Sequence, residues 1–290
     1  MKPILIRLFA IAAGLLLPYA QVQAASPPAF EVSVSGHGQP VILIPGLASA
    51  GAVWDDTVAR YCGQRQCHVL TLAGFAGVPA INAPLLPNVE QQLSDYIANN
   101  HLAQPVIIGH SLGGYLALKL ASDHPRQVGK LIIVDALPAL GATQLPSATP
   151  VQLKEVAGNV RDRMLAQDAA SYAANQRAAL ATMISRPADI ARVAAWGQNS
   201  DRVTVANAMA DLLQDDLRQA IARIQSPTLV LGTWIAYQQY APRAAIEQMY
   251  RQQYSALPGV QLAMADTARH FIMVDDPDWM YARIDEFLKE

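Results

Sequence analysis

Charge, cysteine and long apolar runs are all scarce in this sequence. Charged residues make up only 15% of its 290 positions, and 21 Lys and Arg nearly balance 23 Asp and Glu. No basic run is present, so the charge distribution does not favour a nucleic-acid-binding protein. There is also no internal repeat and no low-complexity linker. With 52% hydrophobic residues, the chain has enough apolar sequence for one sizeable core and a small appended subdomain.

The first 24 residues have the pattern of a secretory signal peptide. Lys2 and Arg7 accompany an apolar run from Ile4 to Leu17, and Val22-Gln23-Ala24 ends the segment with small residues where a signal peptidase cleaves. The run stops at Pro18, short of the roughly 20 residues that span a bilayer. We therefore expect residues 1–24 to be removed, leaving no stable membrane anchor and a periplasmic or secreted protein. Two of the 21 basic residues lie in this leader, so 19 face 23 acidic residues afterwards, a net charge of −4.

The two cysteines, Cys62 and Cys67, stand close together in Tyr-Cys-Gly-Gln-Arg-Gln-Cys-His. In an exported protein such a pair usually forms a disulfide. The alternative is a metal site with His68 as a third ligand, but the sequence offers no second cluster at zinc-ligand spacing. We expect a structural disulfide and no metal or other cofactor.

Short β-branched runs alternate with helical patterns along most of the chain. Buried strands of a parallel sheet have this kind of uninterrupted apolar sequence, and the alternation predicts an α/β fold. The expected strands are residues 30–34, 40–44, 68–72, 106–108, 131–134, 228–231 and 260–265. A hairpin-like turn, Ser35 to Gly38, separates the first two. The helices expected beside them are residues 89–99, 112–123, 243–257 and 277–288.

One region breaks this alternation. Residues 140–223 are rich in Ala, Gln, Arg and Asp and contain no strand-like run. Helices are expected over residues 151–165, 169–184, 187–197 and 203–221. The sequence thus predicts a core made of residues 25–139 and 224–290, interrupted by a helical insertion from 140 to 223.

The strongest chemical signal is Gly109-His110-Ser111-Leu112-Gly113, which fits G-x-S-x-G. A strand precedes it and a helix follows, as in a nucleophile elbow, where a sharp strained turn presents the serine hydroxyl. Small residues two before and two after the serine let the backbones pass. The positive end of the following helix dipole would face a developing oxyanion. We expect Ser111 to be a nucleophile.

A nucleophilic serine needs a base, and the best of the six histidines is His270. It lies in Ala-Asp-Thr-Ala-Arg-His-Phe-Ile-Met, between the last strand and the last helix. A serine in the middle of the chain followed by a late histidine is the chain order of the triad in this kind of fold. His110 belongs to the elbow itself, and the remaining histidines lie at strand or helix ends.

Together these segments resemble the α/β-hydrolase superfamily over nearly all of residues 30–290. Val41-Ile-Leu-Ile-Pro-Gly-Leu is similar to its early oxyanion segment, and Leu72-Ala-Gly-Phe-Ala-Gly to its D-x-P-G-x-G loop without the Asp. His270-Phe-Ile-Met with Pro277 is similar to its H-F-x-M-x-x-x-P ending. The resemblance implies that residues 140–223 form a lid over the site. It also implies an oxyanion hole made by the backbone N–H groups of Leu47 and Leu112.

The acid of the triad departs from the family pattern. The usual carboxylate after residues 228–231 is missing, because Gly232 to Tyr240 contains none before Glu247. Some members carry it after the preceding strand, where this chain has Asp135. That strand neighbours the strand of the nucleophile, so both side chains would emerge at one sheet edge. Asp135 is therefore the expected acid, with Asp266 as a second choice, although a strand-end Asp also commonly bonds local backbone.

These residues predict an ester hydrolase that acts through an acyl-enzyme on a small, apolar substrate. The lid methionines and the aromatic residues Trp196, Trp234 and Tyr237 are the expected substrate-binding residues. Amidase or aminopeptidase, lactonase and C–C bond hydrolase activities remain alternatives on the same triad. A different class, a non-catalytic small-molecule receptor, also stays open because fold alone does not fix function. The sequence does not indicate an oligomeric state.

Overall fold

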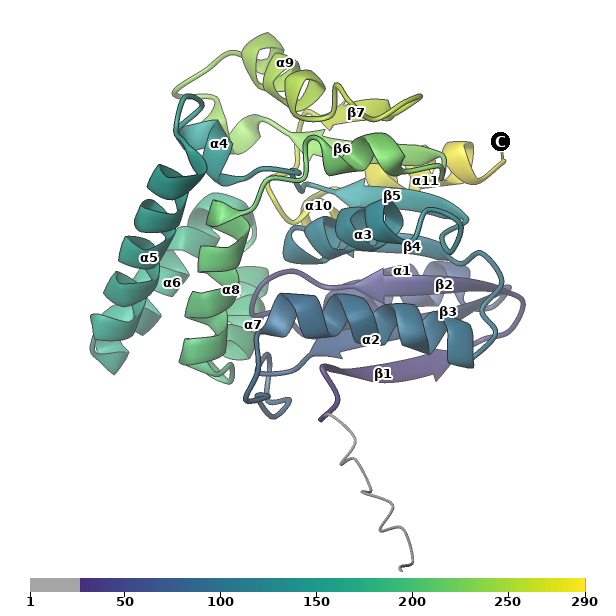
Figure 1. Ribbon diagram of the computed structural model, residues 1–290, viewed down its shortest axis with the longest axis horizontal. Helices are drawn as coiled ribbons and strands as arrows, with labels where there is room; N and C mark the ends of the chain where they lie inside the picture. Colours follow the sequence, from purple (N-terminus) through teal and green to yellow (C-terminus); the bar gives the residue numbers. More distant parts are fainter. Residues whose placement is uncertain (1–26, 290) are drawn as a thin grey trace, which may run out of the picture.

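The computed structural model describes residues 27–289 and builds them around a seven-stranded sheet (Figure 1). Six of the strands are parallel neighbours, and β1 alone runs antiparallel at one edge. The order across the sheet is β1-β3-β2-β4-β5-β6-β7. The strands are β1 (Phe30–Ser35), β2 (Gln39–Ile44), β3 (Arg65–Leu72), β4 (Val106–His110), β5 (Lys130–Val134), β6 (Thr228–Thr233) and β7 (Gln261–Ala265). The expected signal peptide lies outside the described residues.

The turn after residue 34 is hairpin-like in sequence, but the two strands that it joins do not form a hairpin. β1 and β2 are joined by that turn but do not pair, because β3 lies between them. β1 pairs antiparallel with β3, with Phe30 opposite Leu72. The turn residues Gly36 and Gly38 have φ of 76° and 106°, and a Cβ on Gly36 would lie 2.0 Å from the carbonyl oxygen of Cys62. The turn therefore packs against the start of β3 instead of closing a hairpin.

The sheet is buried on both faces, as its continuous apolar strands predicted. In β2, Ile42 and Ile44 pack into the cluster beneath one layer of helices, while Val41 and Leu43 pack into the cluster on the opposite face. The first layer is made of α2 (Leu85–Asn99), α3 (Leu112–Asp123) and α9 (Arg243–Gln253). The second contains α1 (Asp55–Tyr61), α10 (Ile272–Asp275) and α11 (Pro277–Lys289).

A group of helices between β5 and β6 lies at one end of the sheet, beyond the carboxyl ends of the parallel strands (Figure 1). We call residues 141–214 the cap. It contains α4 (Gly141–Gln144), α5 (Pro150–Ala166), α6 (Ala169–Met183), α7 (Pro187–Gln198) and α8 (Arg202–Gln214). Helix α5 packs on α8, and α6 packs on α7.

The last cap helix is shorter than the sequence predicted. It ends at Gln214 instead of continuing to residue 221, because Asp215 takes an extended backbone conformation. The carboxylate of Asp215 accepts a hydrogen bond of 2.6 Å from the hydroxyl of Tyr115 on α3, the helix that follows the elbow. The chain then makes a separate 3-10 turn, Ala220–Arg223, which contacts α3.

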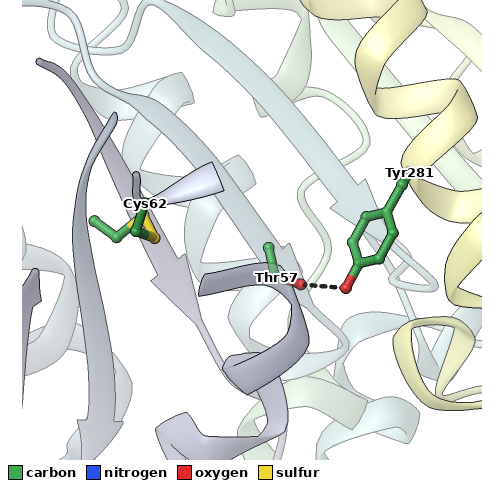
Figure 2. The surroundings of a disulfide bond; sticks show 4 residues. Thr57, Cys62 and Tyr281 are labelled. Carbon is green, nitrogen blue, oxygen red and sulfur yellow. Dashed lines mark hydrogen bonds between the residues drawn. A yellow bond between two sulfur atoms is a disulfide. The ribbon is translucent and has the colours of Figure 1, made fainter. Parts of the chain in front are cut away.

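Cys62 and Cys67 are joined by a disulfide at the end of α1 and the start of β3, with Cα atoms 5.6 Å apart (Figure 2). Nearby, the hydroxyls of Thr57 and Tyr281 lie 3.3 Å apart and tie α1 to α11. Neither cysteine lies on the cavity described below. The oxidation state of the pair in the cell and the export of the protein both stay predictions. No helix within residues 27–289 has the length and apolar character needed to cross a membrane.

Candidate active site

Ser111 occupies the sharp turn between β4 and α3. Its backbone has φ 53° and ψ −119°, a conformation that residues with a side chain rarely adopt and that stores strain of roughly 1–3 kcal/mol. Its N–H donates to the carbonyl oxygen of Val134 at 3.0 Å, which anchors the turn to β5. A Cβ on Gly109 would lie 2.3 Å from the carbonyl oxygen of Gly113, and one on Gly113 would lie 2.3 Å from that of Ile44. The two motif glycines are thus required by close backbone contacts.

His270 and Asp135 come from segments 135 residues apart in the sequence and meet beside the elbow. Asp135 directly follows β5, which pairs with β4, and His270 lies in the loop after β7. Nδ1 of His270 lies 2.6 Å from Oδ2 of Asp135. The backbone of Asp135 also has a positive φ, 48°, which turns its side chain at the end of the strand. The arrangement leaves Nε2 of His270 as the ring nitrogen available for proton transfer.

Two further donors hold the other oxygen of the Asp135 carboxylate. Oδ1 accepts a 3.0 Å hydrogen bond from the N–H of Thr233 and a short one from the hydroxyl of Tyr250. Burial, together with the charge of Asp135, raises the pKa of Tyr250 well above its ordinary value, so the phenol remains a donor. Asp135 is only 8% exposed, and these three contacts offset the desolvation of its charge. Sequence reasoning missed Tyr250 because a lone Tyr in α9 carries no motif.

The other carboxylates considered from the sequence lie elsewhere. Asp266 has a side chain that is 63% exposed, and its Oδ1 lies 2.7 Å from Nε of Arg243. Glu247 forms ion pairs with Arg243 and Arg251. No contact between either carboxylate and His270 is present among the described residues. Asp135 is the carboxylate that meets the histidine.

His110, the second residue of the elbow motif, is fully buried beside the histidine of the site. Its ring centroid lies 4.6 Å from that of His270, and its Nε2 lies 3.1 Å from the backbone oxygen of His270. Burial, and then the nearby His270, lower the pKa of His110 well below its ordinary value. A neutral ring with its proton on Nε2 therefore donates to that carbonyl and helps to fix the His270 loop.

Leu47 and Leu112, the residues expected to form the oxyanion hole, both lie next to the elbow serine. Leu112 is the first residue of α3, so its N–H has no acceptor within the helix. Leu47 belongs to the turn after β2, which is closed by a 3.2 Å hydrogen bond from Ser49 N to Gly46 O. The turn borders the elbow, since a Cβ on Gly46 would lie 3.2 Å from Cβ of Ser111. Leu47 and Ser111 line the same cavity.

That cavity has a volume of about 310 Å³ and lies between the sheet edge and the cap. Its floor includes Ser111, His270, Leu47 and Phe271. Its walls come mainly from the cap and are largely apolar, with polar residues on α6 and just before it. The cap residues are Met164, Gln167, Tyr172, Asn175, Gln176, Ala179, Leu180, Met183, Val193, Gly197, Val205 and Met209. The size is at the lower end of the range for small-molecule pockets.

The aromatic residues that were expected to bind substrate do not line this cavity. Trp196, Trp234 and Tyr237 are absent from its lining within the described part of the chain. Nε1 of Trp234 instead donates to Asp266 at 2.9 Å, and Tyr237 is 49% exposed. Trp196 packs outside the cavity, with the guanidinium of Arg192 over its ring at 5.5 Å. Trp196 is excluded from the lining by its position on α7, because the neighbouring residue Gly197 is the one that faces the cavity.

The corner between α6 and α7 is fastened to the loop that carries His270. The guanidinium of Arg269 donates to the carbonyl oxygens of Ala181 and Ile184, at 2.6 and 3.1 Å. On the other side of the histidine, the N–H of Phe271 donates to the carbonyl oxygen of Met183 at 3.2 Å. Both sequence neighbours of His270 thus bond to the cap, so the cap and the histidine loop form one structural unit.

The fold and this site define a hydrolase of the α/β class, and comparison with known proteins agrees. The model of the Alpha/beta hydrolase family matches residues 41–283. The chain therefore belongs to the alpha/beta hydrolase family. Among solved structures, an enol-lactonase from Burkholderia xenovorans LB400 superposes with a TM-score of 0.74 at 17% identity, covering 90% of this chain and 96% of that one. An esterase from Exiguobacterium antarcticum gives a TM-score of 0.74 at 18% identity, covering 90% and 96%.

Curated relatives share more sequence over shorter stretches. A pimeloyl-(acyl-carrier protein) methyl ester esterase of Vibrio cholerae is 32% identical over 109 residues, which are 38% of this chain and 41% of that protein. A protein of the same name from Nitrosomonas europaea is 24% identical over 235 residues, covering 74% of this chain and 88% of that one. The chain thus spans about two fifths of the length of the Vibrio relative.

Proposed function

We propose that the protein is a serine hydrolase that cleaves carboxylic esters through an acyl-enzyme on Ser111. The observation that carries the proposal is the 2.6 Å contact between His270 Nδ1 and Asp135 Oδ2 beside a strained elbow serine on one cavity. A buried carboxylate that orients an imidazole next to an exposed hydroxyl is the arrangement of serine-dependent acyl transfer. The relatives named as methyl ester esterases make an ester the first substrate to test.

In the first half of the reaction, Nε2 of His270 takes the proton of Ser111 as Oγ attacks the ester carbonyl. The carbonyl oxygen becomes an oxyanion, which the N–H groups of Leu47 and Leu112 stabilise. Asp135 holds the imidazole in the tautomer that carries its proton on Nδ1 and stabilises the imidazolium. The imidazolium then gives the proton from Ser111 to the departing alcohol, and the acyl group remains on Oγ.

In the second half, water replaces the alcohol. His270 takes a proton from a water molecule while the oxygen of that water attacks the acyl-enzyme. The N–H groups of Leu47 and Leu112 stabilise the second oxyanion. Collapse of this intermediate returns the proton to Oγ of Ser111 and releases the carboxylic acid. Every proton transferred in these two steps is exchanged between Ser111, His270, water and the departing alcohol, so the steps balance without a cofactor.

Labelling with a fluorophosphonate tests the proposal and separates it from a receptor of the same fold. We expect the wild-type protein to be labelled covalently within minutes and Ser111→Ala not to be labelled. Absence of label on the wild-type protein would favour a receptor. A panel of p-nitrophenyl esters, the matching anilides and simple lactones then distinguishes esterase from amidase and lactonase, by which class has the highest kcat/KM.

A further inference from the structure

Helix α6 changes character along the face that it presents to the cavity. Tyr172, Gln176, Ala179 and Met183 follow one another at spacings of four, three and four residues, which place them on one side of a helix. Toward the carboxyl end the face is apolar, and the carbonyl of Met183 contacts the loop of His270. Toward the amino end it is polar. The cavity thus has an apolar part beside the reacting groups and a polar part farther away.

The distance between the two parts follows from helix geometry. Gln176 lies seven residues before Met183, which is about 10 Å along the helix axis at 1.5 Å per residue. A substrate whose ester carbonyl lies at Ser111 would need a chain of medium length to reach Gln176. The walls between these points include Met164, Leu180 and Val205, which suit a hydrocarbon chain.

Gln176 carries an unused hydrogen-bonding atom at this far end. Its Oε1 is buried and has no hydrogen-bond partner among the described residues. A buried acceptor without a partner is destabilising, and a donor on a ligand would relieve it. Two neighbouring side chains of the lining already have contacts. Nδ2 of Asn175 donates to Oε1 of Gln167 at 3.1 Å, and the ring of Tyr172 lies 4.4 Å from the guanidinium carbon of Arg202.

Gly197 on α7 makes room for this side chain. A Cβ at position 197 would lie 1.9 Å from Nε2 of Gln176, so any larger residue would displace the carboxamide. Position 197 lies in the last turn of α7 and does not have a positive φ, so its backbone conformation does not itself require glycine. A glycine at this point therefore keeps the Gln176 amide in its place.

The side chains that line the far end of the cavity are uncharged, and the guanidinium of Arg202 lies behind them, against the ring of Tyr172 and bonded to the carbonyl oxygen of Gln167. Over residues 27–289, the lining contains no Asp, Glu, Lys or Arg, and its titratable side chains other than Tyr172 are the two histidines beside Ser111. A carboxylate there has no hydrogen to donate to Oε1 of Gln176, and an ammonium group would lie near the positive charge of Arg202. A neutral group is the one that the site can accept.

We propose that Gln176 is a specificity-determining residue that binds a neutral hydrogen-bond donor, a hydroxyl or carboxamide, at the distal end of a medium-length apolar chain. The substrate class is thus an ester with an ω-hydroxylated or ω-amidated chain. This inference rests on the proposed ester hydrolysis at Ser111 and adds to it the identity of the group that lies farthest from the reacting carbonyl.

Two matched ester series test the proposal. In one, p-nitrophenyl esters carry an alkanoyl, ω-hydroxyalkanoyl or ω-carboxyalkanoyl chain of equal length. In the other, acetates carry the same end groups on the alcohol, so that either half of the ester can occupy the cavity. We expect at least one series to show kcat/KM about tenfold higher for the hydroxyl than for the methyl terminus, the size of one hydrogen bond, with the carboxylate lowest.

Three variants assign the preference. Gln176→Met keeps the length of the side chain but removes the amide, and Gly197→Ala displaces that amide without changing its chemistry. We expect both to lose the hydroxyl preference while still hydrolysing the alkyl esters. Gln198→Met, at an exposed position on α7, should keep the preference.

Equal rates for hydroxyl and methyl termini in both series, or a preference unchanged in Gln176→Met and Gly197→Ala, would overturn the proposal while leaving ester hydrolysis intact. Hydrolysis of none of the esters would contradict the proposed function and this inference together.

Discussion

The hydroxyl of Tyr250 donates a hydrogen bond to Oδ1 of Asp135, the carboxylate oxygen that His270 does not contact. The two side chains come from segments 115 residues apart and meet in the interior between β5 and α9. Because Thr233 N–H donates to the same oxygen, the carboxylate plane is fixed with Oδ2 directed at the imidazole. The orientation of His270 therefore depends on residues that never reach the cavity.

Asp135→Asn tests the role of the carboxylate. Its Nδ2 would face Nδ1 of His270 and donate to it, which stabilises the wrong imidazole tautomer, while Oδ1 keeps its bonds to Tyr250 and Thr233. We expect kcat for ester hydrolysis to fall by about 10⁴ with the fold retained, as loss of the triad acid does in serine proteases. Asp266→Asn is the matched control and should change kcat by less than about tenfold, or about 1.4 kcal/mol. A small effect of Asp135→Asn would remove Asp135 from the mechanism.

Tyr250→Phe tests positioning through the acid. The variant leaves Asp135 with one donor fewer on Oδ1, and we expect about a tenfold fall in kcat with KM little changed. Unfolding free energy should drop by about 1–3 kcal/mol, the effect of an unmet buried hydrogen bond. Tyr254→Phe is the control, since its buried hydroxyl bonds the carbonyl oxygen of Ala136 at 2.7 Å. It should lose stability without losing kcat, and equal kcat losses in the two variants would indicate a purely structural role.

The buried His110 predicts a dependence of stability on pH. Its pKa is lowered in the folded protein by burial, so below about pH 6.5 the unfolded chain binds a proton that the folded protein does not. Stability from this group is complete above that pH and falls by about 1.4 kcal/mol per unit below it. His110→Gln keeps a donor for the His270 carbonyl but cannot ionise, so its unfolding free energy should fall less between about pH 7 and pH 5. His68, whose pKa burial also lowers, is present in both proteins and cancels. Urea denaturation at both pH values measures these free energies, and an equal fall for the wild-type protein and His110→Gln would contradict this account.

The cysteine pair and export are tested together. We propose that the protein is exported, and we expect alkylation of the denatured, unreduced mature protein to find no free thiol. Reduction should lower Tm, while ester hydrolysis at mild temperature stays largely intact, because neither cysteine lines the cavity. The short loop, with the cysteines five residues apart, gives stabilisation at the low end of the usual few kcal/mol. Two alkylated cysteines, or retention of the chain in the cytoplasm on fractionation, would contradict these predictions.

The parts of the fold predicted best from sequence are those whose signal is local. The buried strands and the glycines around Ser111 are visible because a parallel sheet needs uninterrupted apolar runs and a tight elbow needs small residues. The pairing of β1 with β3 was not predicted, since the turn at Gly36 is compatible with β1 pairing either with β2 or with β3. The end of α8 was also missed, because it depends on a long-range contact between Tyr115 and Asp215.

The site shows the same division. Ser111 and His270 could be predicted because each lies in a sequence motif. The hydrogen bond that orients Asp135 comes from Tyr250, which only the tertiary structure brings near it. The lid methionines expected to bind substrate line the cavity, but the expected aromatic residues do not, because aromatic content says nothing about which side of a helix faces the cavity. Gln176 on α6 and the cap methionines, not Trp196 or Trp234, line it.

The central claim is that an acyl group is carried on Ser111, and intact-protein mass spectrometry during turnover of a p-nitrophenyl ester tests it most directly. After rapid acid quenching, wild-type protein should gain the mass of one acyl group, and peptide mapping should place that mass on Ser111. Ser111→Ala should remain folded, gain no mass and hydrolyse the ester several orders of magnitude more slowly. An acyl group found on another residue, or undiminished hydrolysis by Ser111→Ala, would contradict the account.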